Sequence, residues 1–561
     1  METQKKAMPV GVEDFRDLVT KGYHFVDKTR FIREFLDDKG VVTLITRPRR
    51  FGKTLTLSML GYFFTVENAG ENRKLFAGLD IEKAGAEYMG EQGSRPVVFL
   101  TLKEVRSTDF TSMLTGLTEF LRKLYGEFAY LTDSDRLSAQ DKEYFSVIWN
   151  ATGKAELMKV ALSNLMNMLE KHHGIKPLLL LDEYDAPILA AWENGYYREC
   201  VDFMRGFLGS ALKTNPSLGA AVLTGVTRIS KESIFSGLNN LKVCSVLTER
   251  YSDIFGFTQA EAARLMEDCG VKDKLPELKQ WYDGYLFGDT EIYNPWSVIQ
   301  FVDNGCKFQR YWINVSGNSI LGVLLKSVDE ARYEELQGLL SFRASSVEAL
   351  VDEGIIYPDI GTDSNALYMM LLTTGYLKAI EIWQDARGRW WCRLQIPNRE
   401  VLLAYEDEVL ARVAGPGSRV ALFSMLDAMT AGKAAVFQKY LGRILRDMVS
   451  FHDTAQPEAF YHGLMLGLTV LMEGEYRIES NRESGYGRFD IAFFPLKENA
   501  PGVILELKAA KSEEELEAKA REALEQIASK AYNTDLARQG VKEIWSYGIA
   551  FCGKRMWMEV R

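Results

Sequence analysis

Residues 47–54 read R-P-R-R-F-G-K-T, and residues 41–46 directly before them read V-V-T-L-I-T. A short, almost entirely apolar run is typical of a central parallel strand that is buried on both faces. Residues 55–64, L-T-L-S-M-L-G-Y-F-F, have the length and apolar content of a helix. The order of strand, Gly-Lys-Thr loop and helix predicts a site that binds phosphate groups.

This loop has most of the parts that phosphate binding requires. Backbone N–H groups must converge on the phosphates, a lysine must offset their charge, and a hydroxyl must reach Mg²⁺. Lys53 and Thr54 fill the last two roles, and the helix that follows adds the positive end of its dipole. Arg47 stands where the motif has its first glycine, so we expect an altered turn, and Arg49 and Arg50 add compensating charge. A β–α turn that contains Gly-Lys-Thr by chance is the competing interpretation. The expected nucleotide-binding residues of the loop are Arg49, Arg50, Phe51, Gly52, Lys53, Thr54 and Leu55.

Two further strand ends carry polar side chains that suit a nucleotide site. Residues 178–183 read L-L-L-L-D-E, an apolar strand that ends in paired acids. We expect Asp182 to hold Mg²⁺, together with Thr54, and Glu183 to polarise the attacking water. The alternative is that the two acids only cap the next helix. Arg228 ends T-G-V-T-R after another apolar strand, where P-loop ATPases sense the γ-phosphate; a surface salt bridge is its alternative role.

The rest of the chain predicts an α/β protein of several units. Strand-like segments at 96–102, 177–181 and 218–224 alternate with amphipathic helices, which favours an open, mainly parallel sheet. Residues 258–330 look helical and aromatic-rich, and residues 340–400 fit a small helix with a β-wing. At 561 residues the chain is too long for one core, so three or four units are expected.

Four segments together resemble the bacterial AAA-ATPase-like family, which is related to archaeal-type and signal-transducing (STAND) ATPases. They are V-D-K-T at 26–29, R-P-R-R-F-G-K-T, L-L-L-D-E-Y-D-A-P at 179–187, and T-G-V-T-R-I-S-K-E-S-I-F-S-G-L-N-N-L at 224–241. The resemblance spans roughly residues 8–300, and an arginine at position 47 is usual in that family's loop. Y-N-P-W-S-V at 293–298 and Y-W-I-N-V-S-G at 311–317 resemble its lid region. A winged-helix-like unit after the lid is also implied.

A second acidic constellation lies near the end of the chain. Residues 485–494 read G-Y-G-R-F-D-I-A-F-F, and residues 503–508 read V-I-L-E-L-K. Strand alternation places Glu506 and Lys508 on one face, and Asp490 on the preceding strand can reach that face. The two carboxylates would hold Mg²⁺, and the lysine would activate water, which suits phosphodiester hydrolysis. A cross-strand salt bridge without catalysis is the alternative.

The D-x15-E-x-K arrangement resembles the PD-(D/E)XK nuclease superfamily, and such a domain accompanies this ATPase family at its C-terminus. The resemblance implies that Asp490 and Glu506 bind metal and act in catalysis with Lys508. It further implies that Glu458 supplies an extra metal-binding acid and that Gln526 is the occasional motif glutamine. The expected domains are a P-loop AAA-like ATPase core at 1–257, a helical lid at 258–330, a winged-helix-like unit at 331–415 and a smaller nuclease-like α/β domain at 416–561.

Charge, hydropathy and cysteine content indicate which partners and which cellular compartment to expect. The net charge is −10, and residues 421–561 hold 18 Lys and Arg against 20 Asp and Glu, so no strong DNA-binding footprint is visible. The sequence has no long apolar run and no signal peptide at its start, so we expect a cytoplasmic protein without a membrane span. Six cysteines without a C-x-x-C pair fit reduced thiols better than a zinc module or disulfides. The expected partners are ATP, Mg²⁺ and a nucleic acid, with DNA favoured; a homo-oligomer is compatible with the sequence.

Two hypotheses for the whole protein follow. In the first, a slowly hydrolysing ATPase controls a C-terminal metal-dependent nuclease. In the second, the protein is a nucleotide-dependent switch or scaffold whose C-terminal domain binds a partner or nucleic acid without cutting it.

Overall fold

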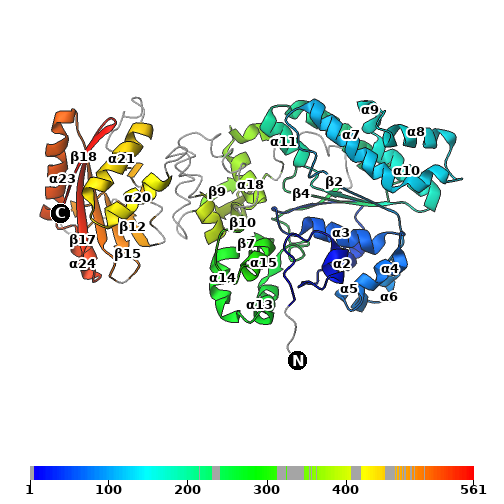
Figure 1. The fold of residues 1–561 in the computed structure, drawn as a ribbon, viewed down its shortest axis with the longest axis horizontal. Coiled ribbons are helices and arrows are strands. Elements are labelled where there is room, and N and C mark those ends of the chain that lie inside the picture. Colours follow the sequence, from blue (N-terminus) through cyan, green and yellow to red (C-terminus); the bar gives the residue numbers. More distant parts are fainter. Residues whose placement is uncertain are drawn as a thin grey trace. The chain divides into compact units, whose positions relative to one another are not determined.

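The chain divides into two compact units in a computed structural model (Figure 1). Unit 1 comprises the described residues up to 324 together with Ser346–Val401, and the described residues of unit 2 lie between Leu402 and Arg561. The structure describes residues 6–213, 215–229, 241–312, 324, 346–352, 354, 357–361, 363–405, 419–448, 461–462, 464–465, 468–469, 472, 475–480, 483–484, 487–497 and 499–561.

A five-stranded parallel sheet forms the centre of unit 1, with the order β2-β3-β4-β1-β5. Its three middle strands are buried along their whole length, which explains why their sequences are continuous apolar runs. Figure 1 shows α3 on one face of this sheet and α7 and α10 on the other. The strands are β1 Val42–Thr46, β2 Val97–Thr101, β3 Leu178–Asp182, β4 Ala220–Gly225 and β5 Leu241–Cys244.

The helices of this part alternate with the strands, as the sequence predicts. They are α1 Phe15–Thr20, α2 Arg30–Asp38, α3 Lys53–Phe64, α4 Ala69–Arg73, α5 Asp80–Lys83, α6 Ala86–Met89, α7 Phe110–Glu127, α8 Ala139–Trp149, α9 Ala155–Met158, α10 Ala161–His173, α11 Ala186–Asn194 and α12 Tyr197–Leu212, with the short 3₁₀ helices η1 Lys74–Phe76 and η2 Ala129–Asp133.

The segment that follows combines three helices with a small antiparallel sheet of order β6-β8-β7. The sequence predicts only helices here, and the difference arises at Gly288. Its φ of +53° gives the turn of a hairpin in which Phe287 pairs with Thr290. A capping box between Thr258 and Glu261 begins the first helix. The elements are β6 Phe257–Thr258, α13 Gln259–Asp268, η3 Lys272–Lys274, α14 Leu275–Tyr282, β7 Tyr285–Phe287, β8 Thr290–Tyr293 and α15 Pro295–Asp303.

Residues 346–401 contain one long helix and a three-stranded antiparallel sheet of order β10-β11-β9. The helix ends at Gly375, whose φ of +88° lies in the left-handed region that favours glycine, and the chain then enters β10. This arrangement contains the predicted helix and β-hairpin, and the winged-helix assignment stays a prediction. The elements are β9 Val347–Leu350, η4 Tyr357–Gly361, α18 Ser364–Thr374, β10 Lys378–Gln384 and β11 Trp390–Gln395.

Unit 2 is built on a five-stranded sheet with the order β12-β15-β16-β17-β18, in which only β16 and β17 pair in parallel. Helices α20 and α21 contribute to the main apolar core on one face, and α23 contributes to a smaller core on the other. The elements are α20 Arg419–Thr430, α21 Ala434–Met448, β12 Tyr476–Ser480, β13 Glu483–Ser484, β14 Gly487–Arg488, β15 Ile491–Pro495, β16 Gly502–Ala509, η6 Glu513–Glu515, α23 Leu516–Ser529, α24 Thr534–Arg538, β17 Ile544–Cys552 and β18 Arg555–Val560.

The predicted fold class is confirmed, since a mixed α/β chain carries a parallel five-stranded sheet in its N-terminal part and a smaller sheet domain at its C-terminus. Across the residues that the structure describes, every helix is too short or too polar to span a bilayer.

Candidate functional site

The phosphate-binding loop connects β1 to α3 in a conformation that exposes the start of the helix. Gly52, the N-cap, has a φ of +83°, and Arg50 has a φ of +69°, so the loop turns twice through the left-handed region. The first intrahelical bond runs from Thr56 N to Gly52 O at 3.0 Å. The backbone N–H groups of Lys53, Thr54 and Leu55 precede this bond and have no carbonyl of their own helix to donate to. They are placed to receive an anion.

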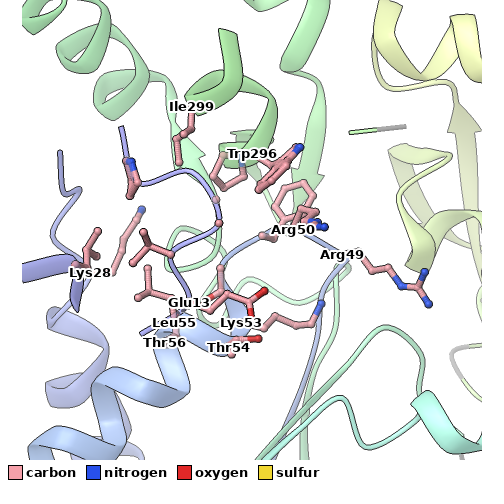
Figure 2. A pocket seen from close by; sticks show the side chains of 18 of the residues that line it. Glu13, Lys28, Arg49, Arg50, Lys53, Thr54, Leu55, Thr56, Trp296 and Ile299 are labelled. Carbon is pink, nitrogen blue, oxygen red and sulfur yellow. Dashed lines mark hydrogen bonds between the residues drawn. The ribbon is translucent and has the colours of Figure 1, made fainter. Parts of the chain in front are cut away.

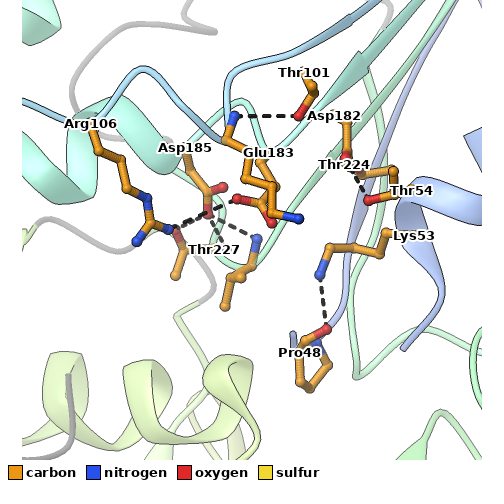
Figure 3. A network of polar contacts seen from close by, with 12 residues as sticks. Pro48, Lys53, Thr54, Thr101, Arg106, Asp182, Glu183, Asp185, Thr224 and Thr227 are labelled. Carbon is orange, nitrogen blue, oxygen red and sulfur yellow. Dashed lines mark hydrogen bonds and ion pairs between the residues drawn. The ribbon is translucent and has the colours of Figure 1, made fainter. Parts of the chain in front are cut away.

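Lys53 is buried beside the loop, with 6% of its surface exposed. Its Nζ donates to the carbonyls of Arg47 at 2.9 Å and Pro48 at 2.8 Å (Figure 3). Burial lowers the pKa of Lys53, and the nearby charge of Glu183 and then Asp182 opposes that shift. The lysine is therefore desolvated and faces the acidic end of β3.

Asp182 joins three elements at the carboxyl end of the sheet. Its carboxylate accepts from Thr54 Oγ1 of α3 at 2.7 Å and from Thr224 Oγ1 of β4 at 2.5 Å. The strand order explains why these three side chains come together. Strand β4 lies between β3 and β1, and the carboxyl ends of parallel strands lie at the same edge of the sheet. The partly buried Thr54 hydroxyl and the buried Asp182 carboxylate together form an oxygen set of the kind that Mg²⁺ prefers.

Glu183 follows at a backbone φ of +50°, which is uncommon for a residue other than glycine. Its Oε2 lies 3.9 Å from Arg106 Nη2, and both side chains line the cavity described below. The next acid, Asp185, accepts from Val226 N at 2.9 Å and from Thr227 N at 2.8 Å. Asp185 therefore fixes the turn after β4 (Figure 3), while Glu183 lines the cavity.

A cavity of about 360 Å³ lies above the loop. All seven predicted loop residues, 49–55, contribute to its lining, together with Glu183 and the N-terminal residues between 9 and 28. Figure 2 shows Trp296 and Ile299 of α15 across the cavity from Thr54. Arg50 stacks on the Trp296 ring at 4.2 Å, whereas Arg49 extends away from the loop.

Arg228 is not brought to this cavity. It is half-buried, and its backbone forms an isolated parallel bridge with Gly354. Its neighbour Thr227 instead lines a smaller cavity of about 40 Å³ beside Glu183. The sensing role of Arg228 stays a prediction.

Arg47 stands at the position of the motif's first glycine but has a different role in the structure. Its side chain is fully buried and donates to the carbonyls of Thr46 at 2.9 Å, Cys244 at 3.0 Å and Tyr251 at 3.3 Å. The guanidinium also lies 4.8 Å from the centre of the Phe287 ring. It therefore anchors the loop to the end of β5 instead of adding charge to the phosphate side.

Sequence reasoning missed several residues of this site, chiefly Arg106, Asp185 and Trp296. Asp185 and Trp296 lie inside segments that carry the family resemblance. The resemblance therefore points to their segments but does not predict their contacts. Arg106 lies in an irregular loop after β2 and has no sequence signal.

The C-terminal constellation assembles on the face of the sheet that α23 covers. Leu505 and Leu507 belong to the opposite core, as alternation predicts. Glu506 accepts from Lys508 Nζ at 3.4 Å and from the Gln526 amide of α23. Asp490 accepts from Leu507 N at 2.7 Å through its Oδ2.

Glu506 is an unusual carboxylate in its surroundings. Only 2% of its surface is exposed, and its Oε2 has no hydrogen-bond partner among the described residues. Burial, and then the charge of Asp490, raises the pKa of Glu506 to about 7. A divalent cation would relieve both effects, so Asp490 and Glu506 fit a metal.

The predicted third acid, Glu458, lies outside the described residues. Within them, no cluster of three or more His, Cys, Asp or Glu side chains is arranged to hold a metal. His462 lies beside the pair, and its Nε2 is 3.2 Å from the Asp490 carbonyl and 3.0 Å from Ser480 Oγ. The ring therefore supports the backbone before β15.

Comparison with known proteins supports the two domains in which these sites lie. Residues 9–235 match the family model described as a predicted AAA-ATPase, and residues 456–561 match that of the PD-(D/E)XK nuclease superfamily. The chain carries an AAA-ATPase-like domain and a PD-(D/E)XK nuclease superfamily domain. The AAA-ATPase-like domain contains the loop and the paired acids of β3, and the nuclease superfamily domain contains Asp490, Glu506 and Lys508.

One curated relative matches most of the chain. It is an uncharacterised protein in the vnfD 5′ region of Azotobacter chroococcum mcd 1, which is 26% identical over 496 residues, 84% of this chain and 85% of the relative. No solved structure matches the chain.

Proposed function

We propose that the AAA-ATPase-like domain binds ATP with Mg²⁺ in the 360 Å³ cavity and hydrolyses it slowly. One observation carries this proposal. Lys53, Thr54 and Glu183 line the same cavity, and Asp182 contacts Thr54 at 2.7 Å directly beneath it. The chemistry of phosphoryl transfer needs these groups: a cation, two oxygen ligands for a metal and a base for water.

The side chains of the loop would then have distinct roles. Lys53 exchanges its two carbonyl partners for the β- and γ-phosphate oxygens, and Thr54 and Asp182 hold the metal, which neutralises developing charge when bound. Glu183 orients the attacking water. In the structure, Arg106 forms an ion pair with Glu183. This ion pair would have to break before Glu183 orients the water.

A test of turnover separates binding from chemistry. Purified wild type should release phosphate from ATP with Mg²⁺, and Glu183→Gln should bind ATP equally well but lose at least about tenfold in rate. Lys123→Ala, on the exposed side of α7, is the control and should match wild type. Equal rates for wild type and Glu183→Gln would remove Glu183 from the mechanism.

We further propose that the PD-(D/E)XK domain is a metal-dependent nuclease under nucleotide control, with DNA as the favoured substrate. The buried Glu506 supports this proposal. One of its carboxylate oxygens has no hydrogen-bond partner within the part of the chain that the structure describes, and it lies next to Asp490 and Lys508, so it is suited to hold a cation. Incubation with single- and double-stranded DNA and RNA, with and without ATP and with Mg²⁺ or Mn²⁺, tests this. Asp490→Asn should abolish any cleavage and leave ATP hydrolysis intact.

A second function has its own support. Asp490 already accepts from Leu507 N, and Glu506 already accepts from Lys508 and Gln526. These contacts could serve a hairpin that binds a partner or nucleic acid without cutting it, in a nucleotide-dependent switch or scaffold. Retention of nucleic acid without cleavage in all metal conditions would favour this scaffold. Cytoplasmic localisation and homo-oligomerisation stay predictions.

A further inference from the structure

A buried carboxylate outside both sites connects the lid to the end of unit 1. Glu400 has no exposed surface. It accepts from Ser297 Oγ of α15 at 2.7 Å, from Tyr311 N at 2.5 Å and from Trp312 N at 2.6 Å. One carboxylate thus fixes the helix that carries Trp296 and also the backbone at residues 311–312.

Trp312 extends this connection to the phosphate-binding loop. Its indole Nε1 donates to the carbonyl of Arg49 at 3.1 Å, and its ring packs 5.3 Å from that of Tyr376. Arg49 lies between the loop carbonyls that Lys53 occupies and the N-cap Gly52. The carbonyls that accept from Lys53 and the carbonyl that accepts from Trp312 therefore belong to consecutive residues of one loop.

The other end of the connection lies where the chain leaves unit 1. Val401 is the last residue of that unit, and its N–H donates to Asn398 Oδ1 at 3.0 Å. Asn398 Nδ2 in turn donates to the carbonyl of Asp283 at 2.8 Å. Residues 398–401 are thus held by buried polar bonds that Glu400 links to the loop.

We propose that the Trp312–Arg49 bond couples the nucleotide loop to residues 398–401, so that ATP binding is transmitted to the point where the chain enters unit 2. This inference rests on the proposed ATP site. Glu400 is a positioning residue, because it acts on the loop through the backbone of Trp312. Trp312 also lines the cavity, and the coupling concerns its bond to the Arg49 carbonyl. A contact that both sites bias is the physical requirement for coupling between them.

Hydrogen exchange of the full-length protein, followed by mass spectrometry, tests the coupling. A slowly hydrolysed ATP analogue with Mg²⁺ should slow amide exchange in the helical residues 401–405 of wild type. Trp312→Phe keeps an aromatic ring at this position and removes the indole N–H donor. It should weaken the analogue's binding by about threefold to tenfold, the range expected for one neutral hydrogen bond. At saturating analogue it should also lose the slowing at 401–405.

A matched control is available in Trp281→Phe. The Trp281 indole N–H is buried and has no hydrogen-bond partner among the described residues, and its ring lies 4.8 Å from the Arg399 guanidinium. The control therefore removes an N–H and perturbs packing next to the same segment without breaking a bond to the loop. It should retain the slowing at 401–405.

Three outcomes would count against the coupling or the site. If wild type binds the analogue and exchange at 401–405 is unchanged, or if Trp312→Phe retains the full slowing, the coupling is refuted and the ATP site stands. If calorimetry detects no binding to wild type, the proposed function itself fails and the coupling falls with it. Should Trp312→Phe not fold, Glu400→Gln, which keeps the side chain's shape, is expected to show the same loss.

Discussion

Replacing Arg47 by glycine distinguishes the sequence motif from the structure. The motif has glycine at this place, so sequence logic predicts an equal or better loop in Arg47→Gly. The structure predicts damage, because the variant would leave buried carbonyls of Thr46, Cys244 and Tyr251 without their donor. Each unsatisfied buried acceptor costs about 1–3 kcal/mol, and the lost stacking on Phe287 adds to this.

The cost is partly offset because the variant no longer buries a charge. We therefore expect Arg47→Gly to lower the stability of the AAA-ATPase-like domain by roughly 3–5 kcal/mol, a fall in Tm of roughly 5–15 °C. Differential scanning calorimetry of the full-length protein without nucleotide measures this. Arg49→Gly is the matched control, because Arg49 extends away from the loop and its loss should cost about 1 kcal/mol or less. An unchanged Tm with tighter ATP binding in Arg47→Gly would refute the anchoring role.

Two predictions concern the nuclease superfamily domain. The folded-state pKa of Glu506 is about 7, above its ordinary value, so the folded state prefers the protonated acid and loses stability as pH rises towards 7. Glu506→Gln should therefore have the same Tm as wild type near pH 4 and a higher Tm than wild type at pH 8. The difference in the free energy of unfolding at pH 8 should be up to about 3 kcal/mol. A lower Tm of Glu506→Gln at pH 8 would contradict the burial argument. The affinity for Mn²⁺, measured by titration calorimetry without nucleotide, should rise with pH up to about 7 and then level off, because the metal binds ionised carboxylates. Asp490→Asn should remove this binding. An affinity that does not depend on pH would exclude Glu506 as a ligand.

Contacts set by local order and periodicity could be predicted from the sequence. The strand–loop–helix order and the acidic strand end brought Thr54 and Asp182 to one edge, and the structure places them 2.7 Å apart. Alternation along β16 placed Leu505 and Leu507 in the core and left Glu506 for the opposite face. These features follow from the geometry of one or two elements.

Contacts that depend on distant segments could not be predicted. Arg47 finds two of its partners, Cys244 and Tyr251, 197 and 204 residues along the chain, so its orientation depends on the assembled fold. The bond between Glu400 and Trp312 joins residues 88 positions apart. Arg228 follows β4 as the sequence predicts, but this position does not determine whether its side chain reaches the cavity.

Titration calorimetry with ATP and Mg²⁺ tests the central claim most directly. Lys53 is the buried cation of the cavity, and a bond from a charged donor contributes about 1.5–3 kcal/mol, so Lys53→Ala should bind ATP roughly tenfold to hundredfold more weakly than wild type. Lys123→Ala removes an exposed lysine from α7 and should bind as wild type does. Equal ATP affinity in wild type and Lys53→Ala would contradict the assignment of this loop as the nucleotide site.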